Sequence, residues 1–587
     1  MKINEILKEF NLRQIQRWTI FSIVIGIVSG FGAVLFYLGL RTVTYYVLGG
    51  IGGFYPPSPG GEFPIFSQPA TNVRWLLFLL PAAGGLLAGI IIYTYAPEAE
   101  GHGTDAVIDA YNNKRGFIRK RIPIIKAISS IITIGSGGSA GREGPIAQIG
   151  AGFGSTFASF LKLSDRDRRI MVICGTAAGI GSIFKAPLGG SIFAIEVLYK
   201  SDMETEGLVP AFISSTVAYS IFSSFFGWGH IFTTPSFNFT DPKELLFYGI
   251  LGMLCAITAI LFVIIFYGLR DKVFKPLKIK PHFKPAIGGL LVGITAIFFP
   301  EVLGTGYGWT QIAINGDIVK MSVILMMVLV LTKILATSFT ISSGGSGGVF
   351  APSLVIGAMV GGAFGQIIAF VFPTIVTQPG SYALVGMGAL LAGAAKVPIA
   401  AIVMVSEMAG NHNLLAPMMV ASTISYVLAG KWTIYEKQVE NRASSLAHRR
   451  EMTVDILESA QVKDAMTTNV IMVNPSWSVR EVLDLIHKFG YTGFPVVDGK
   501  KLVGIISFED AEKVPPDKRD STPVKDVMTK ELIVAVPEES LEDALMKLLD
   551  RKVGRLPVVD DNDQTKLVGL LTKYDIIRAH AKLSSER

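Results

Sequence analysis

Two glycine-rich segments in this 587-residue chain have a composition suited to binding a small anion. They read Gly141-Arg142-Glu143-Gly144-Pro145 and, 207 residues later, Gly348-Val349-Phe350-Ala351-Pro352, and both lie within apolar sequence. A helix that begins after such a break presents unpaired N–H groups and the positive end of its dipole. Two such ends, if they converge, would hold an anion without a full positive charge and so release it quickly. The pattern predicts an anion site built largely from backbone amides.

Glu143 adds an ionisable side chain where the second segment has Phe350. A carboxylate at membrane depth is energetically unfavourable and therefore typical of a functional group. When ionised, it would occupy the place of the anion; when protonated or displaced, it would open the path. The other interpretation is a structural ion pair between Glu143 and the neighbouring Arg142.

The elements that position these segments are expected to span a membrane. Half of the residues are hydrophobic and 17% are charged, against roughly 25% charged in soluble proteins. Uncharged stretches such as Thr19–Leu40, Trp75–Ala96 and Leu245–Leu269 are long enough to cross a hydrocarbon core of about 30 Å. The polar residues 1–18 do not resemble a secretory signal. Their lysines and arginines favour a cytosolic N-terminus.

The membrane region contains a long internal repeat. Residues 97–103 match residues 300–306, 203 positions later, and residues 137–145 match residues 344–352. Lys126 has Lys333 as its counterpart, and a third block matches at 211 positions: Gly175, Lys185, Pro187 and Glu196 fall on Gly386, Lys396, Pro398 and Glu407. The alternative is coincidence among glycine-rich apolar segments. A true repeat predicts two transporter halves, about 75–220 and 285–435, with a substrate site at their junction. It does not tell whether the halves are parallel or inverted.

A second repeat, with an offset of 62, occupies the C-terminal part of the chain. Val462–Thr467 recurs as Val524–Thr529, and Pro495–Asp498 recurs as Pro557–Asp560. Each copy predicts the order strand, helix, strand, strand, helix, in modules at 461–513 and 523–582. We therefore expect a membrane domain at 19–438, a linker at 439–460 and a tandem α+β tail.

The membrane region resembles the CLC family of chloride channels and chloride/proton exchangers across about 17–438. The resemblance rests on the two glycine-rich segments and on Ile434-Tyr435-Glu436. It implies an all-α polytopic domain of two inverted repeats with broken helices, a homodimer with one pore in each subunit, and chloride as substrate. It further implies that Glu143 is the gating glutamate. The anion would be bound at His102, Gly144, Val349, Phe350 and Tyr435.

Two departures from the family pattern bear on mechanism. The first anion-coordinating segment is usually Gly-Ser-Gly-Ile-Pro, but here it is Gly101-His102-Gly103-Thr104-Asp105. His102 could donate to an anion and titrate near neutral pH, or it could simply pack. Exchangers generally carry a glutamate one residue after the position of Glu196, where this chain has Val197. Val197 favours a channel, while a proton relay through Glu196 or water would favour an exchanger.

The tail resembles a pair of CBS domains, which implies a cleft for an adenine nucleotide (ATP, ADP or AMP). Ser507 and Asp510, and likewise Thr572 and Asp575, match a segment whose carboxylate binds ribose hydroxyls. Both pairs can equally be helix N-caps. The net charge of +7 suggests no nucleic-acid partner, and no catalytic motif indicates an enzyme. We expect a multi-pass cell-membrane protein with both termini in the cytosol; a membrane-anchored nucleotide sensor is a distant alternative.

Overall fold

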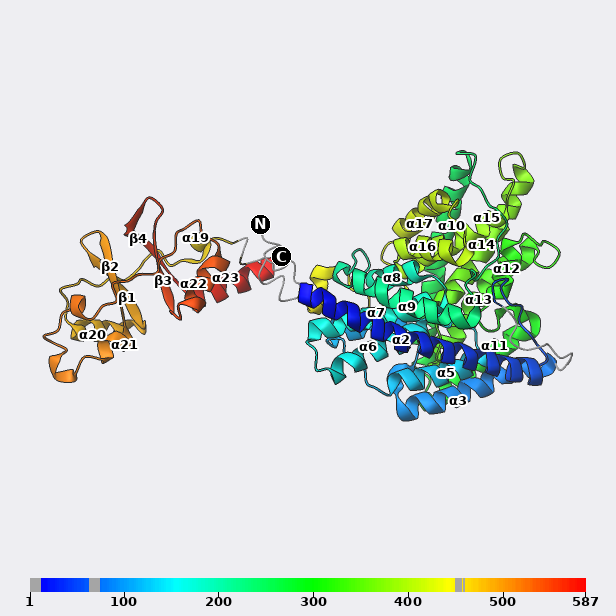
Figure 1. The fold of residues 1–587 in the computed structure, drawn as a ribbon, viewed down its shortest axis with the longest axis horizontal. Helices are drawn as coiled ribbons and strands as arrows, with labels where there is room; N and C mark the ends of the chain where they lie inside the picture. The colour runs from blue at the N-terminus through cyan, green and yellow to red at the C-terminus, as the bar shows by residue number, and fades with distance from the viewer. Residues whose placement is uncertain (1–11, 63–73, 449–456, 458–459, 587) are drawn as a thin grey trace. The chain divides into compact units, whose positions relative to one another are not determined.

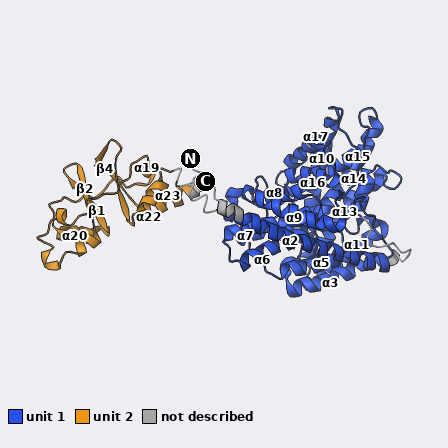
Figure 2. Ribbon diagram, in the orientation of Figure 1, with its two compact units in different colours: residues 1–447 blue, residues 448–587 orange. Residues whose placement is uncertain are grey.

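The computed structural model describes residues 12–62, 74–448, 457 and 460–586 (Figure 1). The chain forms two compact units, residues 1–447 and 448–587 (Figure 2). Residues 1–11 of the expected N-terminal segment, and 449–456 and 458–459 of the expected linker, lie outside the described residues.

The first unit is helical throughout its regular elements, as expected. After the long first helix come two series of helices in the same order. The first helix and first series are α2 (Leu12–Val43), α3 (Leu80–Tyr95), α4 (Thr104–Asn113), α5 (Ile122–Gly135), α6 (Glu143–Phe160), α7 (Asp165–Ile183), α8 (Pro187–Glu196) and α9 (Leu208–Phe226). The second part comprises α10 (Glu244–Leu269), α11 (Lys284–Phe298), α12 (Tyr307–Ile314), α13 (Val323–Ser342), α14 (Phe350–Val371), α15 (Gly380–Ala395), α16 (Pro398–Ala409) and α17 (Leu415–Leu428).

Seven helical segments of the described residues are long and apolar enough to cross a membrane. They include the three predicted spans, now seen as Arg17–Ile51, Leu76–Tyr95 and Glu244–Phe274. Other apolar helices, such as α5 and α16, have only 14 and 12 residues. A helix of that length covers about 20 Å, so it cannot cross a 30 Å core alone. The unit is a membrane domain with broken helices.

The internal repeat is confirmed at the level of individual hydrogen bonds. Lys126 on α5 donates to the carbonyls of Ala99 and Gly101, at 3.0 and 2.7 Å. Its counterpart Lys333 on α13 donates to the carbonyls two and four residues after Pro300, at 2.8 and 2.9 Å. Each lysine therefore fixes the equivalent loop, immediately before α4 and before α12.

A second pair of lysines repeats an unusual backbone conformation. Lys185 and Lys396 follow α7 and α15 with φ of 52° and 58°, a left-handed conformation that is uncommon outside glycine. The Lys185 ammonium donates to the carbonyl of Phe226, and the Lys396 ammonium donates to that of Tyr426. The same side chain thus holds the same turn in both halves.

The tail contains two hairpin modules. The first comprises α19 (Val462–Ala465), α20 (Val479–Phe489), the antiparallel pair β1 (Gly493–Asp498) and β2 (Lys501–Ser507), and α21 (Phe508–Glu512). The second comprises α22 (Leu541–Asp550), the antiparallel pair β3 (Arg555–Asp560) and β4 (Asp563–Thr572), and α23 (Lys573–Glu586). The modules interlock, because Thr467 pairs with Leu570 of the second hairpin while Thr529 pairs with Ile505 of the first.

The first strand expected in each module is not formed as a regular strand. It is reduced to one parallel bridge, Val473 to Val496 in the first module and Ala535 to Val558 in the second. Pro475 and Pro537 stand two residues after these bridges. Proline has no N–H to continue a ladder, so the pairing ends there.

Candidate functional site

The two glycine-rich breaks meet in the interior of the first unit. The amide of Gly141 donates to the carbonyl of Gly348 at 2.7 Å, and the amide of Gly348 donates back to that of Gly141 at 2.6 Å. The two segments run antiparallel at this bridge, as expected for inverted halves. Two residues later α6 begins at Glu143 and α14 begins at Phe350. The predicted convergence of two helix N-termini is therefore present.

Glu143 is fully buried at the start of α6. Its Oε1 accepts a hydrogen bond from the Tyr307 hydroxyl, which belongs to the first residue of α12. Its Oε2 lies near the backbone amide of Ala351 at the start of α14. The carboxylate thus lies between helix N-termini that come from both halves of the repeat. Tyr307 was missed in the sequence; its place 203 residues after Thr104, immediately after the repeat block 300–306, was the available signal.

Arg142 has a stronger partner than Glu143. Its Nη2 donates to Oε1 of Glu62 at 2.5 Å, whereas its Nε lies 3.9 Å from the nearer Glu143 oxygen. Glu62 also accepts from the Tyr37 hydroxyl at 2.9 Å and lies 3.6 Å from Arg41. The ion pair considered between Arg142 and Glu143 is therefore secondary to the pair between Arg142 and Glu62.

Glu62 lies on the connection that follows the first span. Burial would raise the pKa of Glu62, but Arg142 and Arg41 together hold it below its usual range. A cavity of about 120 Å³ adjoins the pair, lined by Tyr37, Arg41, Glu62, Arg142 and Tyr307 among others. Charged side chains of the cavity wall therefore lie next to Tyr307, the donor to Glu143.

His102 lies in a different cavity, of about 650 Å³. The ring is 7% exposed, and its Nε2 lies 3.2 Å from Oδ2 of Asp105. Nδ1 has no hydrogen-bond partner among the residues that the structure describes. The backbone at this point is fixed, because Gly101 donates to the carbonyl of Gly345 and accepts from Lys126. Nδ1 of His102 is thus a buried nitrogen whose hydrogen bond is not supplied by this part of the chain.

The wall of this cavity carries equal numbers of acidic and basic side chains. They are Glu98, Glu100, Asp105, Asp109 and Glu436, with Lys114, Arg270, Lys275, Lys284 and Lys437. These formal charges cancel, so the wall carries no strong net charge.

Tyr435 is buried beside His102, with 5.3 Å between the ring centroids. Its hydroxyl lies near the side chain of Thr104. The preceding residue, Ile434, is fixed by hydrogen bonds to Ala394 and Tyr267. Tyr435 therefore belongs to the His102 side of the site.

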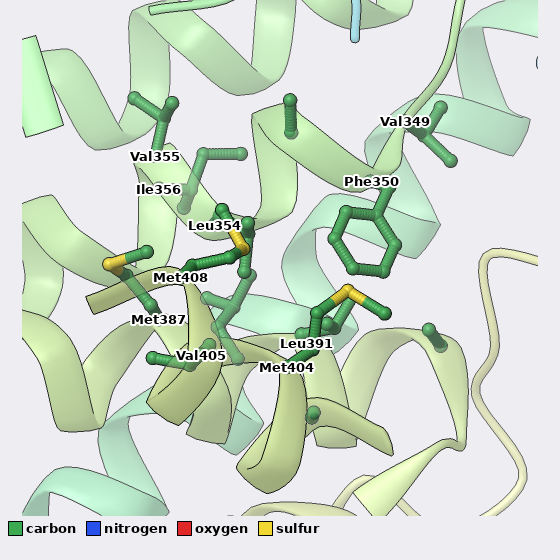
Figure 3. Packing of buried hydrophobic residues seen from close by; sticks show 14 of the residues in the cluster. Val349, Phe350, Leu354, Val355, Ile356, Met387, Leu391, Met404, Val405 and Met408 are labelled. Carbon is green, nitrogen blue, oxygen red and sulfur yellow. The ribbon is translucent and has the colours of Figure 1, made fainter. Parts of the chain in front are cut away.

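Gly144 connects the two sides of the site. A Cβ at Gly144 would stand 1.9 Å from the carbonyl oxygen of His102, a distance that no side chain tolerates. Val349 and Phe350 are buried at the start of α14, and the Phe350 ring packs 4.9 Å from Phe184. Figure 3 shows Phe350 with Leu391 and Met404 in one buried hydrophobic cluster. The predicted anion-binding residues therefore gather around the junction of the two halves.

Glu196 is used as a helix cap. Its two carboxylate oxygens accept from the amides of Ile399 and Ala400, at 3.1 and 2.7 Å, at the start of α16. Glu407 does the same at the start of α8, accepting from Leu188 and Gly189 at 3.2 and 2.7 Å. Val197, at the end of α8, is fully buried.

The hydroxyl-x-x-Asp pairs of the tail have N-cap geometry. The Ser507 hydroxyl accepts from the amide of Asp510 at 3.2 Å and donates to its carboxylate at 2.7 Å. Thr572 and Asp575 repeat both bonds, at 3.2 and 2.6 Å. Partial burial would raise the pKa of Asp510, but the hydrogen bonds from Ser507 keep it below its usual value. The N-cap interpretation is confirmed for both pairs, and the nucleotide contact stays a prediction.

Arg555 links the two modules of the tail and was not anticipated. Its guanidinium donates to the carbonyl of Gly493 and to the hydroxyl of Thr492. Gly493 is the counterpart of Arg555 in the first module, 62 residues earlier. The second module therefore has a guanidinium at the position where the first module has a glycine without a side chain.

Comparisons with known proteins agree with this organisation. The family described as voltage gated chloride channel matches residues 84–430, and the CBS domain matches residues 462–515 and 524–582. The chain is 28% identical over 640 residues to the chloride channel protein CLC-f of Arabidopsis thaliana, covering 94% of this chain and 79% of that protein. It is 31% identical over 372 residues to the H(+)/Cl(-) exchange transporter ClcA of Cronobacter sakazakii, covering 61% and 78%.

A solved structure supports the fold. The crystal structure of a slow cyanobacterial Cl⁻/H⁺ antiporter superposes with a TM-score of 0.61 at 23% identity. The match covers 70% of this chain and 94% of that one.

Proposed function

Because this chain belongs to the family of voltage gated chloride channels, the CLC family, and carries a pair of CBS domains, we propose that it is a chloride channel gated by the Glu143 carboxylate. Chloride transport across a membrane is the activity of this family. The proposal concerns the mode of transport, the gate and the residues that bind the anion.

One observation carries the gate. The Glu143 carboxylate is fully buried between the N-termini of α6 and α14, with the Tyr307 hydroxyl donating to it. Helix N-termini are sites where anions bind, so the carboxylate occupies the position that we propose for chloride. Protonation of Glu143 removes its negative charge, so the carboxyl group no longer competes with chloride for that position and chloride can enter.

The residues on the His102 side of the site and at the starts of α6 and α14 are suited to coordinate the anion. His102 offers an unpartnered Nδ1 beside the 650 Å³ cavity, and Tyr435 offers a buried hydroxyl next to it. Gly144, Val349 and Phe350 contribute the N-terminal turns of α6 and α14. Dipoles and neutral donors of this kind bind weakly enough for rapid release.

Val197 and Glu196 favour a channel over an exchanger. A valine side chain cannot carry a proton, and Val197 is fully buried. Both Glu196 oxygens are engaged by the amides of Ile399 and Ala400. In this arrangement Glu196 caps α16 and is poorly placed to exchange protons with a path through the domain.

The alternative is a chloride/proton exchanger. It is favoured by the His102–Asp105 pair, an ionisable pair at a cavity wall that could replace the missing glutamate. The 31% identity to a protein named as an H(+)/Cl(-) exchange transporter also favours it.

Reversal potentials separate the two modes. Purified protein in planar bilayers, in a chloride gradient with an opposing proton gradient, should reverse at the chloride equilibrium potential whatever the proton gradient. A displacement of the reversal potential by the proton gradient would establish exchange and reject the channel.

The gate is tested by Glu143→Gln, which keeps the size of the side chain and cannot ionise. We expect chloride flux from liposomes to lose its dependence on external pH. Retained pH dependence would assign the sensor to another group.

The remaining assignments follow from family membership. We propose a homodimer with one pore in each subunit, in the cell membrane, with both termini in the cytosol. We further propose that the CBS pair binds an adenine nucleotide, with Asp510 or Asp575 accepting from the ribose. Titration of the purified protein with ATP, ADP and AMP by calorimetry, before and after Asp575→Asn, tests the second point.

A further inference from the structure

The hydrogen bond between Tyr307 and Glu143 joins the two halves of the membrane domain at the gate. Its donor is the first residue of α12, in the second half, and its acceptor is the first residue of α6, in the first half. Both side chains are buried, with 2% and 0% exposure. We propose that the Tyr307 hydroxyl is the positioning residue that holds the Glu143 carboxylate in the closed path and thereby sets the pH at which the path opens. The inference rests on the proposed gate.

The backbone on both sides of Tyr307 is tightly constrained. The chain turns into α12 through Gly306, whose φ is 86°, a value that favours glycine. Gly308, one residue after Tyr307, is so close to the preceding loop that a Cβ would stand 1.9 Å from the carbonyl of Pro57. The first turn of α12 is therefore fixed from both sides.

The ring of Tyr307 is also fixed. The Arg142 guanidinium lies 5.1 Å from the ring centroid, and the Phe232 ring lies edge-on at 5.8 Å. Since Arg142 is itself paired with Glu62, the contacts leave the phenol little freedom to rotate. The hydroxyl is thereby aimed at Oε1 of Glu143.

The equivalent position in the first half carries a different side chain. Thr104, 203 residues earlier, is likewise the first residue of its helix. Its side chain lies near the hydroxyl of Tyr435, on the His102 side of the site. A tyrosine hydroxyl therefore lies on each side of the junction: Tyr307 itself beside Glu143, and Tyr435 beside Thr104, the counterpart of Tyr307.

Other ionisable groups surround Glu143 without replacing this bond. Arg142 precedes it, Glu62 lies on the loop after α2, and Arg41 lies on α2. Lys185, after α7, interacts electrostatically with Arg142 and Glu62, Lys126 on α5 lies beside the Gly103–Gly144 contact, and Tyr435 interacts electrostatically with Glu143 itself. Within the described residues, Tyr307 is the one side chain of this group that hydrogen-bonds the carboxylate.

A donor to an ionised carboxylate stabilises the ionised form. Hydrogen bonds to charged groups are worth enough to move a titration midpoint by about one pH unit or more. Because the ionised carboxylate closes the path, loss of the donor weakens closure. The path then opens at a higher pH than in the wild-type protein.

The test is chloride flux from liposomes as a function of external pH, for the full-length chain. Tyr307→Phe deletes only the hydroxyl, and the half-activation pH should rise by about one unit. Tyr248→Phe is the matched control, because Tyr248 is a buried tyrosine whose hydroxyl bonds Ser381 at 2.9 Å, away from the gate; its half-activation pH should not change. An unchanged or lowered half-activation pH for Tyr307→Phe overturns the proposal.

Two further proteins separate a positioning role from damage to the fold. In a Glu143→Gln background, Tyr307→Phe should cause no additional change in the pH profile; an equal shift in both backgrounds refutes the proposal. Replacement of Tyr307 by 3-fluorotyrosine preserves its shape and strengthens the donor, so the half-activation pH should fall; a rise refutes it.

Failure of the inference is distinguishable from failure of the gate. If Glu143→Gln abolishes pH dependence while Tyr307→Phe leaves the midpoint unmoved, the gate stands and the positioning role falls. If pH dependence survives Glu143→Gln, the gate falls, and a Tyr307→Phe shift in that background then belongs to another sensor.

Discussion

The two halves of the membrane domain share their scaffold and differ in their chemistry. The lysines that fix loops, Lys126 and Lys333, make the same pair of bonds to carbonyls. The carboxylates that cap helices, Glu196 and Glu407, each cap a helix of the other half. These side chains hold the backbone in place through hydrogen bonds, and both halves need the same backbone shape, so each half has the same residue type there.

The differences fall at the junction of the halves. Glu143 corresponds to Phe350, His102 to Thr305 and Val197 to Met408, while Thr104 corresponds to Tyr307. Each of these residues lies within two positions of the start or end of a helix. The comparison teaches that residues shared by the two halves maintain the helix breaks, whereas residues that differ between the halves make the two sides of the proposed path chemically different.

The largest expected effect concerns the buried lysines. Lys126→Met and Lys333→Met each remove two hydrogen bonds. The carbonyls of Ala99 and Gly101 keep donors in Ser346 and Gly347, whereas those of Val302 and Gly304 have Lys333 as their one donor among the described residues. Each substitution should reduce stability by about 1 kcal/mol or more, with the larger loss for Lys333→Met. The measurement is the temperature at which detergent-solubilised protein loses its monodisperse peak. Tolerance of one substitution and not the other would break the equivalence of the halves.

The capping carboxylates should have the next largest effect. Glu196→Gln and Glu407→Gln each remove a charge from a helix N-terminus, which should lower stability by about 1–2 kcal/mol. The same thermal assay measures it. If the protein is a channel, neither substitution alters the reversal potential in a proton gradient; a change with Glu196→Gln alone would assign that side chain to proton transfer.

The third prediction compares His102, which lines the 650 Å³ cavity, with its counterpart Thr305 in the second half. If His102 donates a hydrogen bond to the anion, as proposed, loss of that bond should cost about 1 kcal/mol, or roughly fivefold in chloride affinity. His102→Ala should therefore lower the chloride affinity measured in a flux assay by roughly that factor, and Thr305→Ala, its counterpart, should not. An unchanged chloride affinity in His102→Ala would rule out His102 as an anion ligand.

The smallest effect is expected in the tail, which contains its own repeat. Ser507→Ala and Thr572→Ala each remove an N-cap hydroxyl, so each should cost about 0.5–1 kcal/mol of tail stability. Hydrogen exchange of the first turns of α21 and α23 should increase equally. Unequal exchange would indicate that the module containing Arg555 is stabilised independently of its cap.

Much of the architecture was predictable from local patterns. The spans, both helix breaks and both repeats depend on runs of residue types within a few turns, and all are confirmed. The first strand expected in each tail module forms only one bridge, because Pro475 and Pro537 have no N–H to continue the pairing. Local pattern therefore gives the elements more reliably than their ends.

The sequence by itself determined the repeats, the broken helices and the acidic residue at one break, because each is written in neighbouring residues. Only the tertiary structure decided the partners of those residues: Tyr307 for Glu143, Glu62 for Arg142, and the opposite half for Glu196 and Glu407. These partners lie 80 to 219 residues apart in the chain. A hydrogen bond requires its atoms to lie within a few tenths of an ångström of one distance, and that precision arises only when the two halves pack.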